Sequence, residues 1–166
     1  GETFVTRKIT LGISKIINGL EKSLHLGNIY SLRDWGHAQD YIEMCWKVLQ
    51  YKKPEDFVIA TEKQYSVKFF VEQCFRYMGI KIKWFGQGLK ECAKIIDFDN
   101  KKYPLLKKNM IVIKVSKKYF RPNEVNNLIG NANKAKRLLK WKPKIHIQQL
   151  IKEMMDSDLK LIQNRI

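Results

Sequence analysis

The sequence predicts an α/β or α+β fold built around one hydrophobic core. Two observations support this prediction. Segments with helical spacing of apolar residues alternate with short β-branched runs, and 45% of the 166 residues are hydrophobic against 29% charged. A chain of this length buries roughly 68–70% of the surface that its unfolded form exposes, so a core is possible without disulfide or metal staples. We therefore treat residues 1–166 as one domain.

Helical spacing recurs in five segments. In the first, Val5, Ile9 and Ile13 fall on one face, and Gly19 marks its end. Ser66 is a good N-cap for the third. The helices that we expect cover residues 5–19, 37–51, 66–78, 131–139 and 147–163.

Short extended segments lie between these helices. Residues 56–61 form a compact β-branched run typical of a buried strand, and residues 80–84 alternate as a half-buried strand does. Residues 24–30 and 110–115 are the other expected strands. Residues 86–108 carry two glycines, one proline and a lysine-rich tip, so we interpret them as a loop or insertion.

Cysteine content and hydropathy narrow the class of protein. Cys45, Cys74 and Cys92 are odd in number and far apart, which argues against a disulfide framework and favours a reducing, cytoplasmic compartment. Cys45 falls on the apolar face of its helix, so we expect a buried, inert thiol. No apolar run approaches the roughly 20 residues of a membrane helix. The chain opens on Gly1 without an initiator Met, and we expect a fragment of a longer protein.

The net charge of +16 is concentrated in one stretch. Residues 101–144 hold fourteen Lys or Arg residues and a single acid, Glu124. Such a stretch can bind nucleic acid, but 26 of the 32 basic residues are Lys, whereas recognition of phosphates and guanine edges favours Arg. We therefore expect a solvated lysine-rich surface and no nucleic-acid partner.

The chain lacks the residue patterns of catalysis. It contains no glycine-rich phosphate loop, no Tyr-x-x-x-Lys pair in a suitable setting and no Ser/His/Asp set, and its three histidines stand at unrelated places. We therefore predict no catalytic residue and no metal site in this chain.

Three segments carry a resemblance to a known family. They are Gly-Glu-Thr-Phe-Val-Thr-Arg-Lys-Ile-Thr at 1–10, Leu-Gly-Asn-Ile-Tyr-Ser-Leu-Arg-Asp-Trp-Gly-His-Ala-Gln-Asp-Tyr at 26–41, and Lys-Tyr-Phe-Arg-Pro-Asn-Glu-Val at 118–125. In order and spacing they resemble the C-terminal half of the GDP-mannose 4,6-dehydratases, which are extended short-chain dehydrogenase/reductases. The resemblance covers nearly the whole chain.

The resemblance implies a fold, a reaction and partners. The chain would be the substrate-binding C-terminal portion of an α/β, Rossmann-type fold whose N-terminal dinucleotide-binding half is absent, with 56–61 a late strand of the missing sheet. The family converts GDP-mannose to GDP-4-keto-6-deoxymannose, on the route to GDP-fucose, with NADP held mainly by the N-terminal half. That half would be a partner of this chain, and dimers or tetramers are expected.

Residue by residue, the resemblance places the family's substrate contacts on Val5, Lys8, Arg33, Arg121 and Glu124. Arginine offers fixed bidentate donors, so two of the six arginines would hold the diphosphate of a GDP-sugar. The carboxylate of Glu124 could accept hydrogen bonds from ribose hydroxyls or a guanine edge.

Each charged assignment has a structural alternative. Arg33 could pair with Asp34 or Asp40 and fix the loop that enters the next helix. Arg121 and Glu124 could form an i, i+3 surface pair worth a few tenths of a kcal/mol.

The remaining candidates also have ordinary interpretations. Lys8 could be a solvated surface lysine, and Val5 could lie in the core or meet a ligand through its backbone. We interpret Trp35 and Trp141 as packing anchors and His37 as a helix-start residue.

The chain departs from the family's pattern at a few positions. Lys140 stands where a helix-ending Gly is common, Asn123 replaces a small residue, Ser116 replaces an Asp, and the region 97–108 is longer and more basic than usual. None of these removes a proposed ligand. Two other functions stay open: another nucleotide-sugar epimerase or dehydratase, and a non-catalytic basic binding module.

Overall fold

The computed structural model describes residues 3–120 and 127–164. No helix in this described part is long and apolar enough to cross a membrane. Its elements, in chain order, are α1 (Val5–Ile17), β1 (Leu24–Leu26), β2 (Leu32–Arg33), α2 (Ala38–Leu49), β3 (Tyr65–Ser66), α3 (Val67–Tyr77), β4 (Lys81–Phe85), the 3-10 turn η1 (Gly88–Lys90), β5 (Cys92–Asp97), β6 (Ile111–Val115), the 3-10 turn η2 (Lys117–Tyr119), α4 (Asn133–Leu139) and α5 (Ile147–Gln163).

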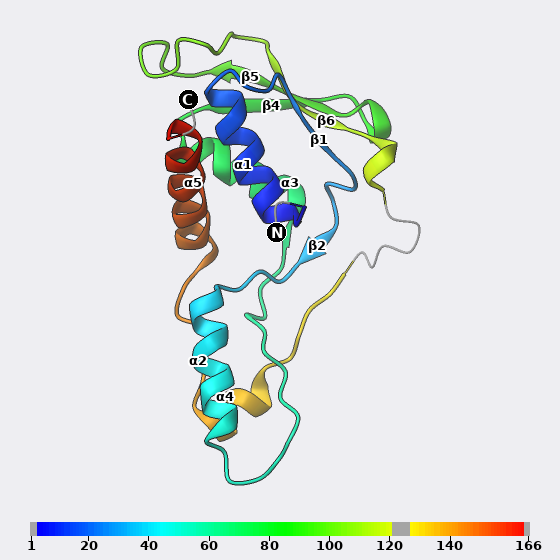
Figure 1. Cartoon of the computed structure of the whole chain (residues 1–166). Helices are drawn as coiled ribbons and strands as arrows, with labels where there is room; N and C mark the ends of the chain where they lie inside the picture. The colour runs from blue at the N-terminus through cyan, green and yellow to red at the C-terminus, as the bar shows by residue number, and fades with distance from the viewer. Residues whose placement is uncertain (1–2, 121–126, 165–166) are drawn as a thin grey trace.

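A four-stranded mixed sheet organises the larger part of the chain. Its strand order is β1-β6-β5-β4, with β1 parallel to β6 and the other two pairs antiparallel. Helices α1, α3 and α5 pack together beside this sheet, and we call this unit the sheet lobe (Figure 1). The parallel pair sets Leu24 opposite Ile113, so the first and third quarters of the chain meet in one ladder.

The core of the sheet lobe confirms the helical spacing found in the sequence. Ile9 and Ile13 of α1 and Phe70 and Phe75 of α3 are completely buried, and they belong to the same core as Ile113 of the sheet. Full burial of one such side chain contributes roughly 1.5–3 kcal/mol, so this layer of helices and sheet is the main source of stability.

Local backbone features explain where the helices begin and end. The Phe69 N–H donates to the Ser66 Oγ at 3.0 Å, which confirms Ser66 as a cap. His37 is the N-cap of α2, because its Nδ1 accepts the Gln39 N–H at 3.1 Å, so the helix-start interpretation is confirmed as well. Lys140 ends α4 with a φ of 50°, the left-handed conformation that a glycine adopts most easily.

The remaining helices form a second, smaller unit. Helices α2 and α4, with residues 50–64 and 127–146 around them, enclose their own core, and we call this unit the small lobe (Figure 1). Trp141 is its anchor, as expected: it is 1% exposed and its indole Nε1 donates to the Asp40 carbonyl at 3.0 Å. The members of this core are Met44, Ala60, Ala132, Ala135, Leu139 and Trp141.

Residues 56–61 are extended and pair with no described segment, so their assignment to a late strand of the missing sheet stays a prediction. The loop prediction for residues 86–108 was wrong, because β5 lies inside this range and its Ala93 and Ile95 alternate into the core between β4 and β6. The tip after β5 is also anchored: Tyr103 is buried and its hydroxyl donates to the Met78 carbonyl at 2.8 Å.

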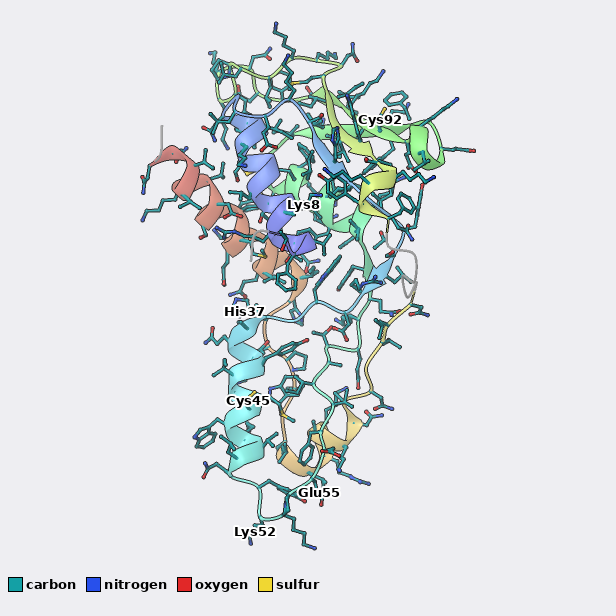
Figure 2. All side chains as sticks on the ribbon, turned by 45° about the vertical axis from the view of Figure 1, so that its right-hand side comes forward. Lys8, His37, Cys45, Lys52, Glu55 and Cys92 are labelled. Carbon is teal, nitrogen blue, oxygen red and sulfur yellow. The ribbon has the colours of Figure 1, made fainter. Side chains whose placement is uncertain are left out.

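The predicted burial of Cys45 was wrong too. Cys45 is exposed on α2 (Figure 2). The reason is that α2 carries two apolar stripes, and the stripe that reaches the core of the small lobe is Tyr41, Met44 and Val48. The other stripe, which includes Cys45, faces outward.

Candidate functional site

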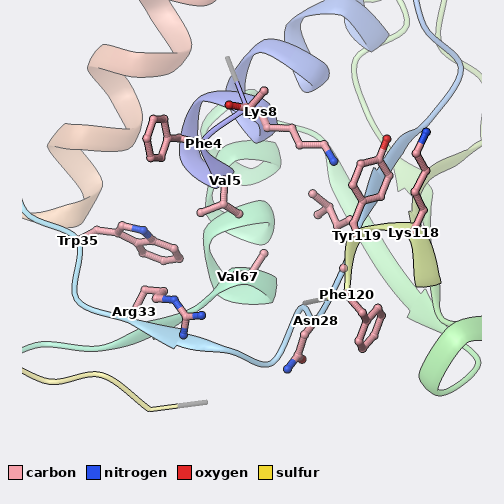
Figure 3. A pocket seen from close by; sticks show the side chains of 13 residues that line it. Phe4, Val5, Lys8, Asn28, Arg33, Trp35, Val67, Lys118, Tyr119 and Phe120 are labelled. Atoms are coloured by element: carbon pink, nitrogen blue, oxygen red, sulfur yellow. The ribbon is translucent and has the colours of Figure 1, made fainter. Parts of the chain in front are cut away.

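A cavity of about 470 Å³ lies where the start of α1, the end of β1, β2, the start of α3 and η2 meet (Figure 3). Five segments that are distant in sequence therefore build one site. Its lining residues are Thr3, Phe4, Val5, Lys8, Leu26, Gly27, Asn28, Arg33, Trp35, Val67, Lys118, Tyr119 and Phe120.

The start of α1 gives one wall of the cavity. Val5 is the first helical residue and Lys8 follows one turn later, so both reach the same space. Phe4 supplies no side-chain cap to the helix, and the first turn contains no acid. Backbone N–H groups and the helix dipole make such an end attractive to an anion.

The Lys8 ammonium group lies over an aromatic ring that lines the cavity. Its Nζ is 3.3 Å from the centroid of the Tyr119 ring, toward which the side chain extends from α1 (Figure 3). Burial lowers the pKa of Lys8, and the nearby Lys118 cation lowers it further. A bound anion would relieve both effects.

Arg33 enters the cavity from β2. Its Nη1 donates to the Leu32 carbonyl at 2.7 Å, and β2 is held by pairing with β3. The two acids considered as alternative partners have backbone partners of their own. One Asp34 oxygen accepts the Glu62 N–H at 2.9 Å, and one Asp40 oxygen accepts two N–H groups, those of residues 144 and 145, at 2.9 Å. Arg33 therefore lines the cavity from a strand whose position is fixed by pairing.

Aromatic and apolar groups complete the cavity. The Trp35 ring meets Phe70 edge-on, with 5.0 Å between centroids, so Trp35 packs on the core as expected and also lines the cavity. Val67 and Phe120 add apolar surface. A cavity with cations on one side and ring surfaces on another suits a ligand that joins an anion to a flat ring.

One glycine permits the close approach of two walls. A Cβ at Gly27 would stand 2.1 Å from the Tyr119 carbonyl oxygen and 2.7 Å from its carbonyl carbon. Both are backbone atoms, which cannot swing aside as a side chain can. Only glycine therefore lets the segment after β6 run against the end of β1 and close the cavity.

The structure adds two polar residues that the sequence assignment missed. Lys118 lines the cavity from η2, and Asn28 lines it just after β1. Both stand inside the segments that carry the family resemblance, and ligands commonly bind beyond the carboxyl ends of strands. That position was the signal that could have identified Asn28.

The structure brings together three of the five predicted contacts. Val5, Lys8 and Arg33 line the same cavity although they come from two elements. Arg121 and Glu124 lie outside the described residues. Their assignment stays a prediction.

The cavity is equipped for binding. Its described lining includes three cations, Lys8, Arg33 and Lys118, and no carboxylate or histidine. Within residues 3–120 and 127–164, no group of three or more His, Cys, Asp or Glu side chains could hold a metal ion. Such a lining can attract and orient an anion.

Comparison with known proteins identifies the family. A family model for GDP-mannose 4,6 dehydratase matches residues 1–154 of the chain. The chain belongs to the GDP-mannose 4,6-dehydratase family. It is 48% identical over 163 residues to the GDP-mannose 4,6-dehydratase of Vibrio cholerae, covering 98% of this chain and 44% of that relative. GDP-mannose 4,6 dehydratase 2 of Caenorhabditis elegans is 45% identical, covering 98% and 40%.

Solved structures agree on the fold. The structure of RMD from Pseudomonas aeruginosa complexed with NADPH superposes with a TM-score of 0.72 at 15% identity, covering 97% of this chain and 44% of that one. The predicted α/β fold, part of an extended short-chain dehydrogenase/reductase fold, is confirmed. This member of the GDP-mannose 4,6-dehydratase family spans less than half the length of the relatives that it matches.

Proposed function

We propose that this chain is the sugar-nucleotide-binding part of an enzyme that converts GDP-mannose to GDP-4-keto-6-deoxymannose. The observation that carries the proposal is the single cavity that gathers Val5, Lys8 and Arg33, the three described residues that the family resemblance assigns to the substrate. The family membership supports the choice of substrate, since its relatives are GDP-mannose 4,6-dehydratases.

The charges of the cavity support a diphosphate ligand. Arg33 can donate two parallel hydrogen bonds to phosphate oxygens, whereas Lys8 and Lys118 act as point charges. In this proposal Arg33 and Arg121 hold the diphosphate, Lys8 and Val5 meet the nucleotide at the start of α1, and Glu124 accepts hydrogen bonds from the nucleoside.

The chemistry itself is assigned to the half of the family's polypeptide that lies outside this chain. NADP would take a hydride from the sugar and return it. No glycine-rich turn leads from a strand into a helix in the part of the chain that the structure describes, so we place the cofactor on the N-terminal half. This chain would bind and orient GDP-mannose. A cytoplasmic enzyme that forms dimers or tetramers is the corresponding expectation.

Calorimetric titration tests the proposal directly. The chain is titrated with GDP-mannose, GDP and a UDP-sugar, and GDP-mannose and GDP are expected to bind more tightly than the UDP-sugar. Arg33→Ala should weaken GDP binding about 10- to 150-fold, because a hydrogen bond to a charged group contributes roughly 1.5–3 kcal/mol. The matched control is Arg76→Ala, an exposed arginine on α3 outside the cavity lining, which should leave the affinity unchanged.

Three other results of these binding measurements would contradict the proposal. Preference for the UDP-sugar would indicate a different nucleotide-sugar enzyme. Nucleic-acid binding that falls steeply with salt, without GDP binding, would indicate a basic binding module. Equal GDP affinity for Arg33→Ala and the unaltered chain would remove Arg33 from the site.

A further inference from the structure

Glu91, immediately before β5, is a buried carboxylate outside the described lining of the cavity. It is 4% exposed, and the Tyr30 hydroxyl lies 2.8 Å from both of its oxygens, so this hydroxyl can donate to either. The Lys68 Nζ donates to Oε1, also at 2.8 Å. Burial of a carboxylate is costly unless its partners lie close, and Glu91 has two such partners.

The two partners of Glu91 belong to segments that build the cavity. Tyr30 stands two residues after Asn28 in the loop that joins β1 to β2, and Asn28 lines the cavity (Figure 3). Lys68 follows Val67, another lining residue, in the first turn of α3. Glu91 therefore ties together two walls of the cavity without lining it.

The Tyr30 backbone fixes the direction of the Asn28 side chain. The Tyr30 N–H donates to Asn28 Oδ1 at 3.0 Å, so the residue that Glu91 holds also orients an amide that lines the cavity. The same loop is joined to α3 by two backbone hydrogen bonds. The N–H groups of Val67 and Lys68 donate to the carbonyls of residues 31 and 29, at 3.2 and 2.7 Å. A displacement of Tyr30 would therefore also displace the cavity wall.

The Lys68 ammonium group is held by aromatic rings as well as by the carboxylate. Its Nζ is 4.7 Å from the centroid of the Trp84 ring and 5.1 Å from that of the Tyr30 ring. Cation–π contacts add to an ion pair when the cation is partly buried. The Trp84 indole is fixed in turn, since its Nε1 donates to Glu72 Oε1 at 2.9 Å. Tyr30, Lys68, Trp84 and Glu91 thus form one cluster of mutually ordered side chains.

We propose that Glu91 is a positioning residue for the site: through Tyr30 and Lys68 it holds the loop between β1 and β2 against α3, in the arrangement that takes the anionic ligand. The proposal rests on the proposed function, since its ligand is GDP. Hydrogen bonds are directional, so this cluster stabilises one arrangement of the loop, whereas an apolar contact would permit several. Only molecules with the loop in that arrangement bind, and loss of Glu91 lowers their fraction.

A role in stability alone makes a different prediction. Removing one partner of a buried ion pair destabilises a fold, whatever the site nearby. In that case a Glu91 variant would unfold more easily, yet the molecules that remain folded would bind GDP as before. Affinity measured well below the unfolding temperature therefore separates the two roles.

Calorimetric titration of three variants with GDP tests the proposal. Glu91→Ala should lower the affinity about tenfold, which corresponds to a binding arrangement populated about one tenth of the time. Glu91→Gln keeps an oxygen acceptor at the end of a side chain of the same length, so it should restore the affinity to within about threefold of the unaltered chain. Tyr30→Phe removes the donor on the loop and should lower the affinity about fivefold.

A double-mutant cycle shows whether these losses share one cause. Tyr30→Phe added to Glu91→Ala should weaken GDP binding no further, because Glu91→Ala has already removed the contact of the hydroxyl. The matched control is Tyr103→Phe, which deletes a hydroxyl that donates to the Met78 carbonyl, also at 2.8 Å, outside the cavity lining. The control should lower stability and leave the GDP affinity unchanged.

Amide hydrogen exchange gives a second measurement, made on the chain without ligand. The N–H groups of Tyr30, Val67 and Lys68, which hold the loop in place, should exchange faster in Glu91→Ala and in Tyr30→Phe than in the unaltered chain. In Tyr103→Phe they should exchange at the unaltered rate. Because Tyr30 is 58% exposed, Tyr30→Phe keeps the core intact and provides this comparison even if Glu91→Ala does not fold.

Three results would overturn the proposal. They are unchanged GDP affinity in Tyr30→Phe and in the folded Glu91 variants, loop N–H groups that exchange no faster in any of them, and an equal loss of affinity in Tyr103→Phe. The two measurements also separate this proposal from the proposed function. Faster loop exchange in a chain that binds no GDP contradicts only the proposed substrate, whereas equal GDP binding by all variants contradicts only the positioning role.

Discussion

At the scale of single residues, Lys8 combines a function with a cost. Burial and the Lys118 cation lower its pKa below 10.5, so the folded chain releases this proton more readily than the unfolded chain does. Between the lowered pKa and 10.5 the unfolded state binds more protons, and stability therefore rises with pH across that window. The positive charge on Lys8 lowers the stability of the folded chain, and it lies at the site where the proposed ligand is an anion.

Lys8→Met tests this balance. As pH rises from neutrality toward 10.5, the unaltered chain should gain free energy of unfolding relative to Lys8→Met, because only the unaltered chain has this partly buried ammonium group, which loses its proton. Urea unfolding at several pH values measures this difference. The same variant should bind GDP more weakly at neutral pH. A stability difference that does not vary with pH would contradict the role of burial.

The close approach of the backbone at Gly27 leads to a second prediction. Gly27→Ala should displace the Tyr119–Phe120 segment, because the new Cβ would meet the Tyr119 carbonyl oxygen at 2.1 Å, and GDP affinity should fall with stability. Gly79→Ala is the control: its Cβ meets nothing within 4 Å, and with a φ of 72° it should cost only about 1–2 kcal/mol of stability. Calorimetry measures the GDP affinity of each variant, and thermal unfolding measures its stability. GDP affinity that survives in Gly27→Ala would show that the cavity tolerates the displacement.

At the scale of elements, α5 holds α1 in place through one buried carboxylate. The Asp158 side chain is fully buried, accepts a hydrogen bond from Thr10 Oγ1 at 2.6 Å, and lies 2.6 Å from Arg7 Nη1. Arg7 and Thr10 stand on either side of Lys8 in the sequence. The contact between the helices therefore also fixes the direction in which Lys8 points.

Asp158→Ala should destabilise the chain by about 1.5–3 kcal/mol, because it removes a buried carboxylate that accepts a hydrogen bond from Thr10 and pairs with Arg7. Asp156→Ala is the control on the same helix: its carboxylate binds Lys152 at 2.7 Å at the surface and should contribute at most about 1 kcal/mol. Urea unfolding of both variants measures the difference. Equal losses would mean that the buried network contributes no more than the surface pair.

The helices were predictable because their spacing is carried by many residues, whereas strands of two or three residues carry almost no pattern. β2 and β3 contain two residues each, and β5 was hidden between two glycines and a lysine-rich tip. Residues 56–61 have strand character but no described neighbour, and their place in the missing sheet stays a prediction, because a strand is defined by its pairing. For α2, spacing revealed an apolar stripe but could not say whether the remainder of the molecule covers it.

The site was predictable only in part, and for a different reason. The motif around Arg33 and that around Lys8 indicated ligand contacts through resemblance, and the structure places both in one cavity. Lys118 was one lysine among 26 and carried no signal of its own. Which lysine faces a cavity depends on how η2 packs against α1, and that packing is a tertiary property.

At the scale of the whole molecule, the two lobes have separate cores. The basic stretch 101–144 is divided between them: its first lysines lie on the tip after β5, Lys118 lines the cavity, and the last belong to the small lobe. The described lysines of this stretch are therefore distributed over both lobes, and the absence of a nucleic-acid partner stays a prediction.

Because the two lobes have separate cores, we expect each lobe to unfold independently of the other. Trp141→Ala should open the small lobe, because removing a buried tryptophan costs about 3–5 kcal/mol. Hydrogen exchange should then lose protection in α2 and α4 while α1, α3 and α5 keep theirs. Leu128→Ala, which removes an exposed residue of the same lobe, is the control and should leave both lobes protected. Loss of protection throughout the chain would show that the lobes unfold as one unit.

The pairing of β1 with β6 has a consequence for synthesis. Leu24 finds its ladder partner Ile113 only after 89 further residues have been made, and α1 meets Asp158 later still. During translation the first helix and strand therefore wait without their partners, while the short-range turns of α2 and α3 can already form. The cavity assembles only after β6 and η2 have left the ribosome, so a nascent chain stopped before β6 can bind no nucleotide at this site.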